Sequence, residues 1–357
     1  MPVVDDQRRS NGERPLVTVL MPIYNGEAFV AEAVESILDQ TFQDFEFLVI
    51  DDGSTDKSVE IVERYDDPRI RLIRNEQHKE LIRTLNRGLE LAQGKYVARM
   101  DADDISLPDR LERQVGFLEA NADVGACGTW VVLMGDREGE IWRYPESSEG
   151  VLCRLLFHAS LAHPTVCMRR EVFDQHALRF DEGYQHAEDY ELWGRASEVI
   201  SLANIGSVLL RHRIHAKSVT QKHSEVQEAT VKRIHRERLG RLGLTPTEEE
   251  LFIHRWVVTC GPIDQILSLS ELGNWLEKLL RSNEAHGLYP RPAFEQLLGH
   301  FWLKAAYRNL EAGQPAISRF SHSPLARNVV LKDRIRLYGY AAKSALRMAG
   351  GRVALEG

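Results

Sequence analysis

The feature that most constrains the fold is the alternation of short apolar runs with helical patterns between residues 16 and 100. Four segments have the length and composition of buried strands: residues 17–24, 46–50, 70–73 and 96–100. Between them, apolar side chains recur every three or four residues, as in amphipathic helices. Strands and helices that alternate with short connections form right-handed crossovers. The sequence therefore predicts an α/β fold, with a mainly parallel sheet flanked by helices.

Three polar loops follow predicted strands and carry the first chemical signal. They cover residues 22–26, 51–56 and 101–104. In an open α/β sheet, loops at the carboxyl ends of the strands face one crevice, where ligands bind. The last loop holds Asp101, Asp103 and Asp104, which repel one another when unpaired and suit a hard cation such as Mg²⁺ or Mn²⁺. A solvated acidic turn is the common explanation of an isolated D-x-D, but the position after a strand favours a metal site.

Two common nucleotide-binding motifs are absent from the sequence. No G-x-G-x-x-G follows the first strand and no G-x-x-x-x-G-K-[ST] occurs, which argues against dinucleotide oxidoreductases and P-loop NTPases. The polar groups that remain suit a nucleotide held by hydrogen-bond acceptors. Asp51 or Asp52 can accept from a base or a ribose hydroxyl, and Tyr24 can lie against a base. The charge of a diphosphate would be neutralised by a metal on the acidic loop.

Length and composition are typical of a folded protein with more than one part. At 357 residues the chain exceeds a typical single domain, which predicts one large domain with an appendage. The net charge of −8 argues against nucleic acid as the main partner. Four cysteines without a C-x-x-C spacing are typical of reduced thiols and predict a cytoplasmic protein. Residues 1–15 lack the apolar core of a signal peptide, and we expect a flexible tail there.

Four motifs occur in the order and spacing of one known enzyme family. They are V-T-V-L-M-P-I-Y-N-G at 17–26, F-L-V-I-D-D-G-S-T-D at 47–56, L-N-R-G-L-E-L-A-Q-G-K-Y-V-A-R-M-D-A-D-D at 85–104, and H-A-E-D-Y-E-L-W-G-R-A at 186–196. Over about residues 15–220 the chain resembles glycosyltransferase family 2, whose members have the GT-A fold. The resemblance implies inverting transfer of a sugar from a nucleotide diphosphate donor, with UDP-sugars favoured. It also implies Mg²⁺ or Mn²⁺ as the cofactor.

The resemblance also assigns residues to the donor side of the site. Contacts to the donor nucleotide are expected from Pro22, Tyr24, Asn25, Asp51, Asp52, Arg83, Asp101 and Ala102. Asp103 is the expected direct metal ligand, and Asp101 is a second ligand. His215 follows a predicted strand at 207–210, in a segment similar to the R-x-H of relatives. It is a candidate ligand of the metal or the diphosphate, with a solvated strand end as the equal alternative.

One segment departs from the family pattern. Many relatives carry a small, glycine-bearing segment before the Asn86 region, whereas this chain reads N-E-Q-H-K-E-L-I-R-T-L-N. His78, Lys79 and Arg83 are candidate contacts to the donor phosphates. Cations on a solvated helix start explain them equally well, so both interpretations stay open.

The acceptor side centres on Glu188 and Asp189. Acidic residues in the first turn of a helix normally complement the helix dipole, and spacing alone favours that explanation. An acceptor hydroxyl is a poor nucleophile at neutral pH, however. If the upstream loops bind a sugar donor, the site also needs a carboxylate that takes the proton of this hydroxyl. The resemblance implies that Asp189 is this base, and Glu188 is then a supporting or acceptor-orienting group. Trp193 and Asp104 are further candidates on this side of the site. The Trp193 ring could stack on a sugar, although aromatic residues at such positions are more often part of the core.

The resemblance ends near residue 220. We expect a catalytic domain at 16–220 and a helical region at 221–357. Near the end, Leu331, Ile335, Tyr338, Ala342, Leu346 and Ala349 share one predicted helical face, and Lys332, Arg336, Lys343 and Arg347 form an adjoining stripe. Such a helix can lie on the anionic inner face of the cell membrane, near lipid-linked acceptors. It can equally pack on its own domain or on a second subunit.

Three classes of function remain in view. The favoured one is a metal-dependent glycosyltransferase that builds surface polysaccharide, lipopolysaccharide or another glycan. The second is a nucleotidyltransferase that forms an activated sugar, although the first loop lacks a glycine- and Arg/Lys-rich triphosphate site. The third is a non-catalytic protein that binds nucleotide sugars. The presence of Asp101, Asp103 and Asp189 together argues against it.

Overall fold

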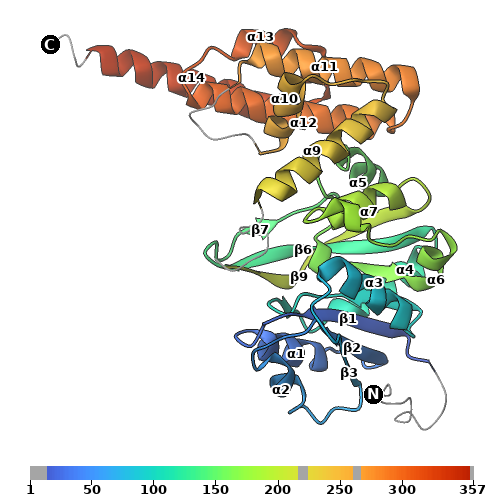
Figure 1. The fold of residues 1–357 in the computed structure, drawn as a ribbon. Helices are drawn as coiled ribbons and strands as arrows, with labels where there is room; N and C mark the ends of the chain where they lie inside the picture. Colours follow the sequence, from blue (N-terminus) through green and yellow to red (C-terminus); the bar gives the residue numbers. More distant parts are fainter. Residues whose placement is uncertain (1–13, 216–223, 260–266, 354–357) are drawn as a thin grey trace. The chain divides into compact units, whose positions relative to one another are not determined.

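The computed structural model describes residues 14–215, 224–259 and 267–353, so the predicted N-terminal tail lies almost wholly outside these ranges (Figure 1). The chain divides into two compact units. The first contains Met1–Val151 and Ala159–Thr230, and the second contains Leu152–His158 and Val231–Gly357. The second unit thus includes a short internal segment, 152–158, that sequence analysis did not separate from its neighbours.

Within the described residues, the first unit is built on a nine-stranded sheet of order β3-β2-β1-β4-β8-β6-β9-β5, with β7 paired to β6. The strands are β1 (Val17–Ile23), β2 (Phe45–Asp51), β3 (Ile70–Arg74), β4 (Tyr96–Arg99), β5 (Ile105–Ser106), β6 (Val124–Gly135), β7 (Ile141–Trp142), β8 (Cys167–Arg169) and β9 (Ser201–Ile214). Strands β3, β2, β1 and β4 pair in parallel, as do β6 and β9, whereas β8 is antiparallel to β4 and β6. The predicted α/β fold with a mainly parallel sheet is confirmed.

Helices cover both faces of the parallel strands. The first unit contains α1 (Val30–Leu38), α2 (Ser58–Val62), α3 (Leu81–Leu91), α4 (Arg110–Ala120), α6 (Arg170–Gln175) and α7 (Glu188–Ala196), together with the start of α5 (Ser148–Arg154). Because both faces are covered, β1 and β2 are buried at every position. On the inner side of α1, Val30, Ala33, Val34 and Ile37 are completely buried, as their spacing predicts.

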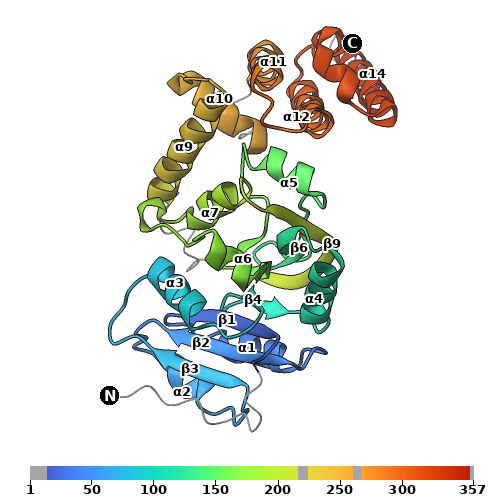
Figure 2. The same ribbon diagram turned by 90° about the vertical axis from the view of Figure 1, so that its right-hand side faces the viewer.

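The order of the strands determines where a ligand can bind. Strands β2 and β3 lie on one side of β1, and β4 lies on the other. Right-handed crossovers therefore place α1 and α2 on one face of the sheet and α3 on the opposite face (Figures 1 and 2). A crevice opens at such a reversal point, beyond the carboxyl ends of the strands. The loops after β1 and β4 border this point.

The second unit is helical, as predicted. It contains most of α9 (Ser224–Arg241), then α10 (Glu248–Thr259), α11 (Leu269–His286), α12 (Arg291–Glu311), α13 (Ile317–His322) and α14 (Leu331–Val353). Its core includes Trp256, Trp275 and Trp302. The segment 152–158 adds Phe157 to this core, and His235 Nε2 donates to the Phe157 carbonyl oxygen over 2.9 Å. Among the described residues, no helix combines the length and apolarity needed to cross a membrane.

Candidate active site

The first two donor loops are tied together by side-chain hydrogen bonds. The Asn25 N–H donates to Ser54 Oγ over 2.9 Å, and Asn25 Oδ1 accepts from the Thr55 N–H over 2.9 Å. The Gly26 N–H donates to Ser58 Oγ over 2.8 Å. Asn25 has φ of 50°, a left-handed conformation that Asn tolerates better than most residues. These bonds hold the loops after β1 and β2 together at the carboxyl ends of the two strands.

The loop after β1 also carries an aromatic side chain, Tyr24, which is held in place by residues near the end of β2. The Tyr24 ring is 49% exposed and stacks on His78, with ring centroids 3.9 Å apart. His78 is held by Asp52, since its Nδ1 lies 2.9 Å from Asp52 Oδ2. Asp52 also accepts from Asn75 Nδ2 and from the Lys79 N–H. The Lys79 backbone, rather than its ammonium group, thus contributes to this part of the site.

Asp51 and Asp52 differ in how many hydrogen bonds their carboxylates accept. Both residues are 3% exposed. Asp51 Oδ1 accepts one long bond, 3.2 Å, from the Ser54 N–H, whereas Asp52 accepts from three groups. Asp51 is therefore better placed than Asp52 to accept a further bond from a nucleotide.

The three carboxylates of the acidic loop after β4 lie close to one another. One oxygen from each of Asp101, Asp103 and Asp104 lies within 4.8 Å of the others. Asp101 is paired through both oxygens with Arg99, over 2.5 and 2.6 Å, and Arg99 is 3% exposed. Asp103 Oδ2 lies 3.0 Å from His215 Nε2. The three carboxylates thus have different partners, although they lie close together.

Asp104 connects this loop to the end of β9. It is completely buried, lies 3.1 Å from His212 Nδ1 and accepts from the Arg213 N–H over 2.9 Å. Strand β5 also pairs with β9, so that Ile105 lies opposite Arg211. These bonds bring the His215 side chain back to the loop that follows β4.

The electrostatics of the cluster favour an added positive charge. Burial raises the pKa of Asp104 to about 6, in spite of its bond with His212. Burial, and then the charge of Asp101, raises the pKa of Asp103. Burial alone would lower the pKa of His212, but its interactions with Asp104 outweigh this effect and raise that pKa. The carboxylate of Asp103 and the imidazole of His215 offer the oxygen and nitrogen donors that Mn²⁺ accepts.

The Glu188-Asp189 pair lies near this cluster. Glu188 begins α7 and is 7% exposed. Burial raises its pKa to about 7, the charge of Asp189 adds to the rise, and the charges of Arg99 and Asp101 also act on it. Asp189 is half-buried in the same turn, and its Oδ1 accepts from the Tyr190 N–H over 2.7 Å. Glu188 is therefore close enough to Arg99 and Asp101 for their charges to act on its carboxyl.

Two further expected site residues, Trp193 and Arg83, have side chains that contact other residues of the first unit. Trp193 is completely buried, against Phe173 and Phe180, so its ring cannot reach a sugar and can only support α7 from within. Arg83 is 61% exposed and pairs with Glu182 over 2.8 Å. Its side chain is engaged by the 3₁₀ turn Glu182–Tyr184, which precedes the Glu188-Asp189 pair.

Sequence reasoning missed Arg99, His212 and Arg213, which hold the acidic loop in place. Arg99 could have been found from the sequence, because it lies at the end of a buried strand, where a cation needs a charged partner such as one of the nearby aspartates. Glu80 was missed as well. Its φ is 69° and its ψ is 161°, a conformation that is essentially restricted to glycine, in the segment where relatives carry glycine.

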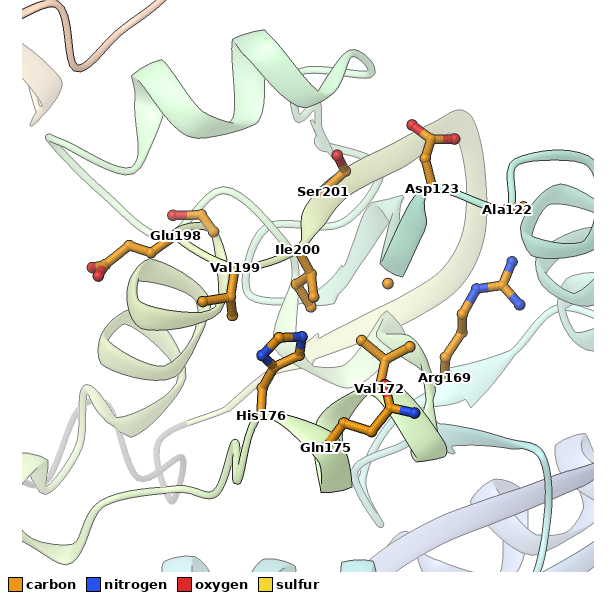
Figure 3. Close-up of a pocket in the computed structure, with 12 residues that line it drawn as sticks. Ala122, Asp123, Arg169, Val172, Gln175, His176, Glu198, Val199, Ile200 and Ser201 are labelled. Atoms are coloured by element: carbon orange, nitrogen blue, oxygen red, sulfur yellow. The ribbon is translucent and has the colours of Figure 1, made fainter.

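A pocket of about 480 Å³ lies at a different part of the first unit (Figure 3). Asp123, Arg169, His176 and Ser201 are among its lining residues, and it lies where β9 begins rather than where β9 ends. The Arg169 guanidinium is already bonded to the carbonyl oxygens of Val124, Leu118 and Asn121. No residue of the acidic loop or of the Glu188-Asp189 pair lines this pocket.

Comparisons with known proteins agree with this geometry. The model of the family described as "Glycosyl transferase family 2" matches residues 18–176. An uncharacterized glycosyltransferase of Haemophilus influenzae is 35% identical over 237 residues, which cover 63% of this chain and 73% of the relative. The Escherichia coli enzyme named UDP-Glc:alpha-D-GlcNAc-diphosphoundecaprenol beta-1,3-glucosyltransferase WfgD is 28% identical over 207 residues, which cover 57% of this chain and 79% of the enzyme.

A solved structure extends the likeness of fold beyond the matched family region. Staphylococcus aureus TarS 1-349 in complex with UDP-GlcNAc superposes with a TM-score of 0.55 at 17% identity. The likeness covers 84% of this chain and 92% of that one, and at this identity it bears on the fold alone, which is of the GT-A type. The match to the family model and the identity to the Haemophilus influenzae relative lead to one conclusion: the chain is a glycosyltransferase that belongs to glycosyl transferase family 2.

Proposed function

We propose that the protein transfers a sugar, with inversion, from a UDP-sugar to an acceptor hydroxyl, and that Asp189 is the general base. The support for this proposal is that the acidic loop and the Glu188-Asp189 pair belong to the same unit, with Glu188 close enough to Arg99 and Asp101 for their charges to act on it. Inverting transfer needs a site for the leaving diphosphate and a base for the acceptor, close to one another. The two motifs supply these two parts.

The donor nucleotide would lie at the carboxyl ends of β1 and β2. Tyr24 offers the exposed part of its ring to a base, and Asp51 offers an oxygen to a base N–H or a ribose hydroxyl. Uridine is favoured because WfgD is named for UDP-Glc and the TarS structure contains UDP-GlcNAc. His78 and Asp52 would hold the Tyr24 ring in position rather than contact the donor.

Asp103 and His215 would hold Mn²⁺ or Mg²⁺, because the other two carboxylates of the loop are engaged by Arg99 and by the end of β9. When bound, the cation neutralises the diphosphate and makes it a better leaving group. Asp101, fixed by Arg99, would face the ribose or add a second ligand. Asp104 would keep His215 within reach of Asp103.

The two carboxylates at the start of α7 would take different roles. Glu188 is buried and its pKa is raised to about 7, so its carboxyl keeps a proton at pH values where an ordinary glutamate has lost it. A neutral Glu188 does not repel the Asp189 carboxylate, and it can donate a hydrogen bond to the acceptor. Asp189 would then take the proton of the attacking hydroxyl, a contribution of about 10²–10⁴ in rate.

The acceptor would be a growing glycan or a lipid-linked sugar in the synthesis of a cell-surface polysaccharide. The support for this class is the acceptor in the name of WfgD, a sugar on diphosphoundecaprenol.

The test is incubation of the protein with a panel of nucleotide sugars and Mn²⁺, followed by chromatography of the nucleotide products. We expect slow release of UDP from a UDP-sugar, abolished by a chelator and by Asp103→Asn. Asp66→Asn is the matched control, since Asp66 is exposed and lies outside the site. Pyrophosphate release from a nucleoside triphosphate and a sugar phosphate would support a nucleotidyltransferase instead. Binding of nucleotide sugars with no turnover under any condition would support a non-catalytic protein.

A further inference from the structure

Positive charge is concentrated at the end of a chain that is negative overall. The chain has a net charge of −8. Between residues 316 and 353, however, there are eight lysines and arginines and a single acidic residue, Asp333. This segment contains α13 and α14 of the second unit. Segregation of charge to this degree indicates a surface with an anionic partner.

The structure shows which side of α14 is available to that partner. Leu337 is completely buried, and the Tyr338 hydroxyl lies 3.0 Å from Ser321 Oγ, so both residues pack on their own unit. Tyr338 borders the face that carries Leu331 and Ile335, and it marks the limit of the part of that face that is exposed. Leu331 is 67% exposed and Ile335 is 61% exposed. In the helical unit, α14 lies at the edge, next to α12 (Figure 2). One side of the helix thus carries large apolar residues that nothing in the described chain covers.

The exposed side of α14 is divided into two bands. At about 100° per residue, Leu331, Ile335 and the exposed Ala342 fall within about 40° of one another around the helix. Lys332, Arg336 and Lys343 are also exposed and form a second band of similar width beside the first. The side chains of Leu346, Arg347 and Ala349, which sequence analysis placed on the same two bands, lie outside the part of the chain whose side chains are described.

This pattern fits the surface of an anionic bilayer better than it fits other partners. Apolar side chains at the boundary of head groups and acyl chains, with cations beside them at the lipid phosphates, are typical of helices that lie in a membrane surface. A two-fold dimer through the same face would bring two cationic bands together, which like-charge repulsion disfavours. A nucleic acid would leave the exposed leucine and isoleucine unexplained.

We propose that the exposed face of α14 binds an anionic lipid bilayer, with Leu331 and Ile335 inserted between head groups and Lys332, Arg336 and Lys343 at the lipid phosphates. The helix lies on the membrane and does not cross it. The proposal stands on the charges and exposures of the second unit, independently of the sugar-transfer chemistry.

The test is co-sedimentation of the full chain with vesicles of phosphatidylcholine that contain or lack phosphatidylglycerol. We expect binding only to the anionic vesicles, weakened by salt. Reversing the charge at Lys332, Arg336 and Lys343 to glutamate should weaken binding on the order of 100-fold. The same reversal at Arg14, Lys57 and Arg64, which are exposed residues of the first unit, is the matched control and should leave binding unchanged.

A second variant separates apolar insertion from simple charge attraction. Leu331→Ser with Ile335→Ser keeps every charge and should still weaken binding at least tenfold. Unchanged binding in this variant would overturn the proposed insertion. Failure of the wild-type chain to bind anionic vesicles would overturn the whole proposal. Self-association in analytical ultracentrifugation, lost in the serine variant while vesicle binding persists, would show instead that the apolar band serves a second copy of the chain.

Discussion

Asp103 Oδ2 and His215 Nε2 lie 3.0 Å apart, although the two residues are separated by 112 positions in sequence. The contact depends on Asp104, which binds the end of β9 through His212 and the Arg213 N–H. It brings together an oxygen and a nitrogen that can each bind a metal, beside the carboxyl end of β4 and next to the point where the strand order reverses. A pair of donors held in this way is suited to share one cation.

The first prediction concerns His215. Replacement by alanine should raise the Mn²⁺ concentration needed for half-maximal turnover by roughly tenfold or more, because one donor is lost while Asp103 remains. The melting temperature should change little, since His215 is at the end of a strand and half-buried. His176→Ala, at an imidazole remote from the acidic loop, is the control. An unchanged metal requirement would remove His215 from the cation site.

The second prediction concerns Arg99. Arg99→Gln would leave Asp101 without the partner that holds both of its oxygens, and would leave the interior of the site with uncompensated negative charge. We expect a loss of about 2–4 kcal/mol in the free energy of unfolding, measured by urea denaturation. In the exposed pair of Arg137 and Glu140, the equivalent change Arg137→Gln should cost less than about 1 kcal/mol. Equal effects of the two substitutions would refute a special role for Arg99.

The third prediction concerns pH and Glu188. Its pKa is raised from 4.5 to about 7 in the folded protein, so the folded state holds a proton that the unfolded state has already released between these values. The resulting penalty is absent below about pH 4.5, grows as the pH rises and is complete above about pH 7. Asp104, with its pKa raised to about 6, adds a penalty of the same sign that starts near pH 4.

Glu188→Gln removes the first of these penalties. The variant should be more stable than the wild type by about 2–3 kcal/mol at pH 8, and the difference should vanish near pH 4.5. Glu191→Gln is the control on the same helix, because Glu191 is paired with Arg195 and its removal should not stabilise the protein at any pH. Thermal unfolding across this pH range measures both. A constant difference between Glu188→Gln and wild type would contradict the raised pKa.

Sequence reasoning succeeded where a periodic pattern or a local motif carried the information. The four strands β1 to β4 and helix α3 follow from apolar spacing, and the loops after β1, β2 and β4 follow from the ends of those strands. The strand predicted at 207–210 is only part of β9, which spans Ser201–Ile214. The residues after 210 include charged side chains, which hide the strand in the sequence, although their backbone pairs with β6. Pairing between distant strands has no periodic signature in one sequence.

The remaining differences have the same origin. Asp104 and His212 are joined only through the pairing of β5 with β9, which a single sequence does not reveal. Trp193 was expected near the acceptor because of its place in a motif, whereas the structure buries its ring in the core. Helix α7 has one side in the core and another facing solvent. The position of a residue in a sequence motif does not show on which of these sides its side chain lies.

The fourth prediction concerns the backbone at Glu80. Its φ of 69° with ψ of 161° costs a residue with a side chain roughly 1–3 kcal/mol, and glycine adopts this conformation freely. Glu80→Gly should therefore stabilise the protein by about 1 kcal/mol, once the entropy cost of glycine in the unfolded chain is included. Within α3, Glu90→Gly should instead destabilise it by about 1 kcal/mol. Destabilisation by both substitutions, measured by chemical denaturation, would show that Glu80 is not strained.

The roles of Asp103 and Asp189 are separated by measuring nucleotide binding and turnover independently in Asp103→Asn and Asp189→Asn. Isothermal titration with UDP and Mn²⁺ measures the donor site, and UDP release in the presence of an acceptor measures transfer. We predict that Asp103→Asn loses the Mn²⁺-dependent part of UDP binding. Asp189→Asn should bind UDP as the wild type does, while its transfer rate falls by about 10²–10⁴. Wild-type UDP affinity in Asp103→Asn, or wild-type turnover in Asp189→Asn, would contradict the account.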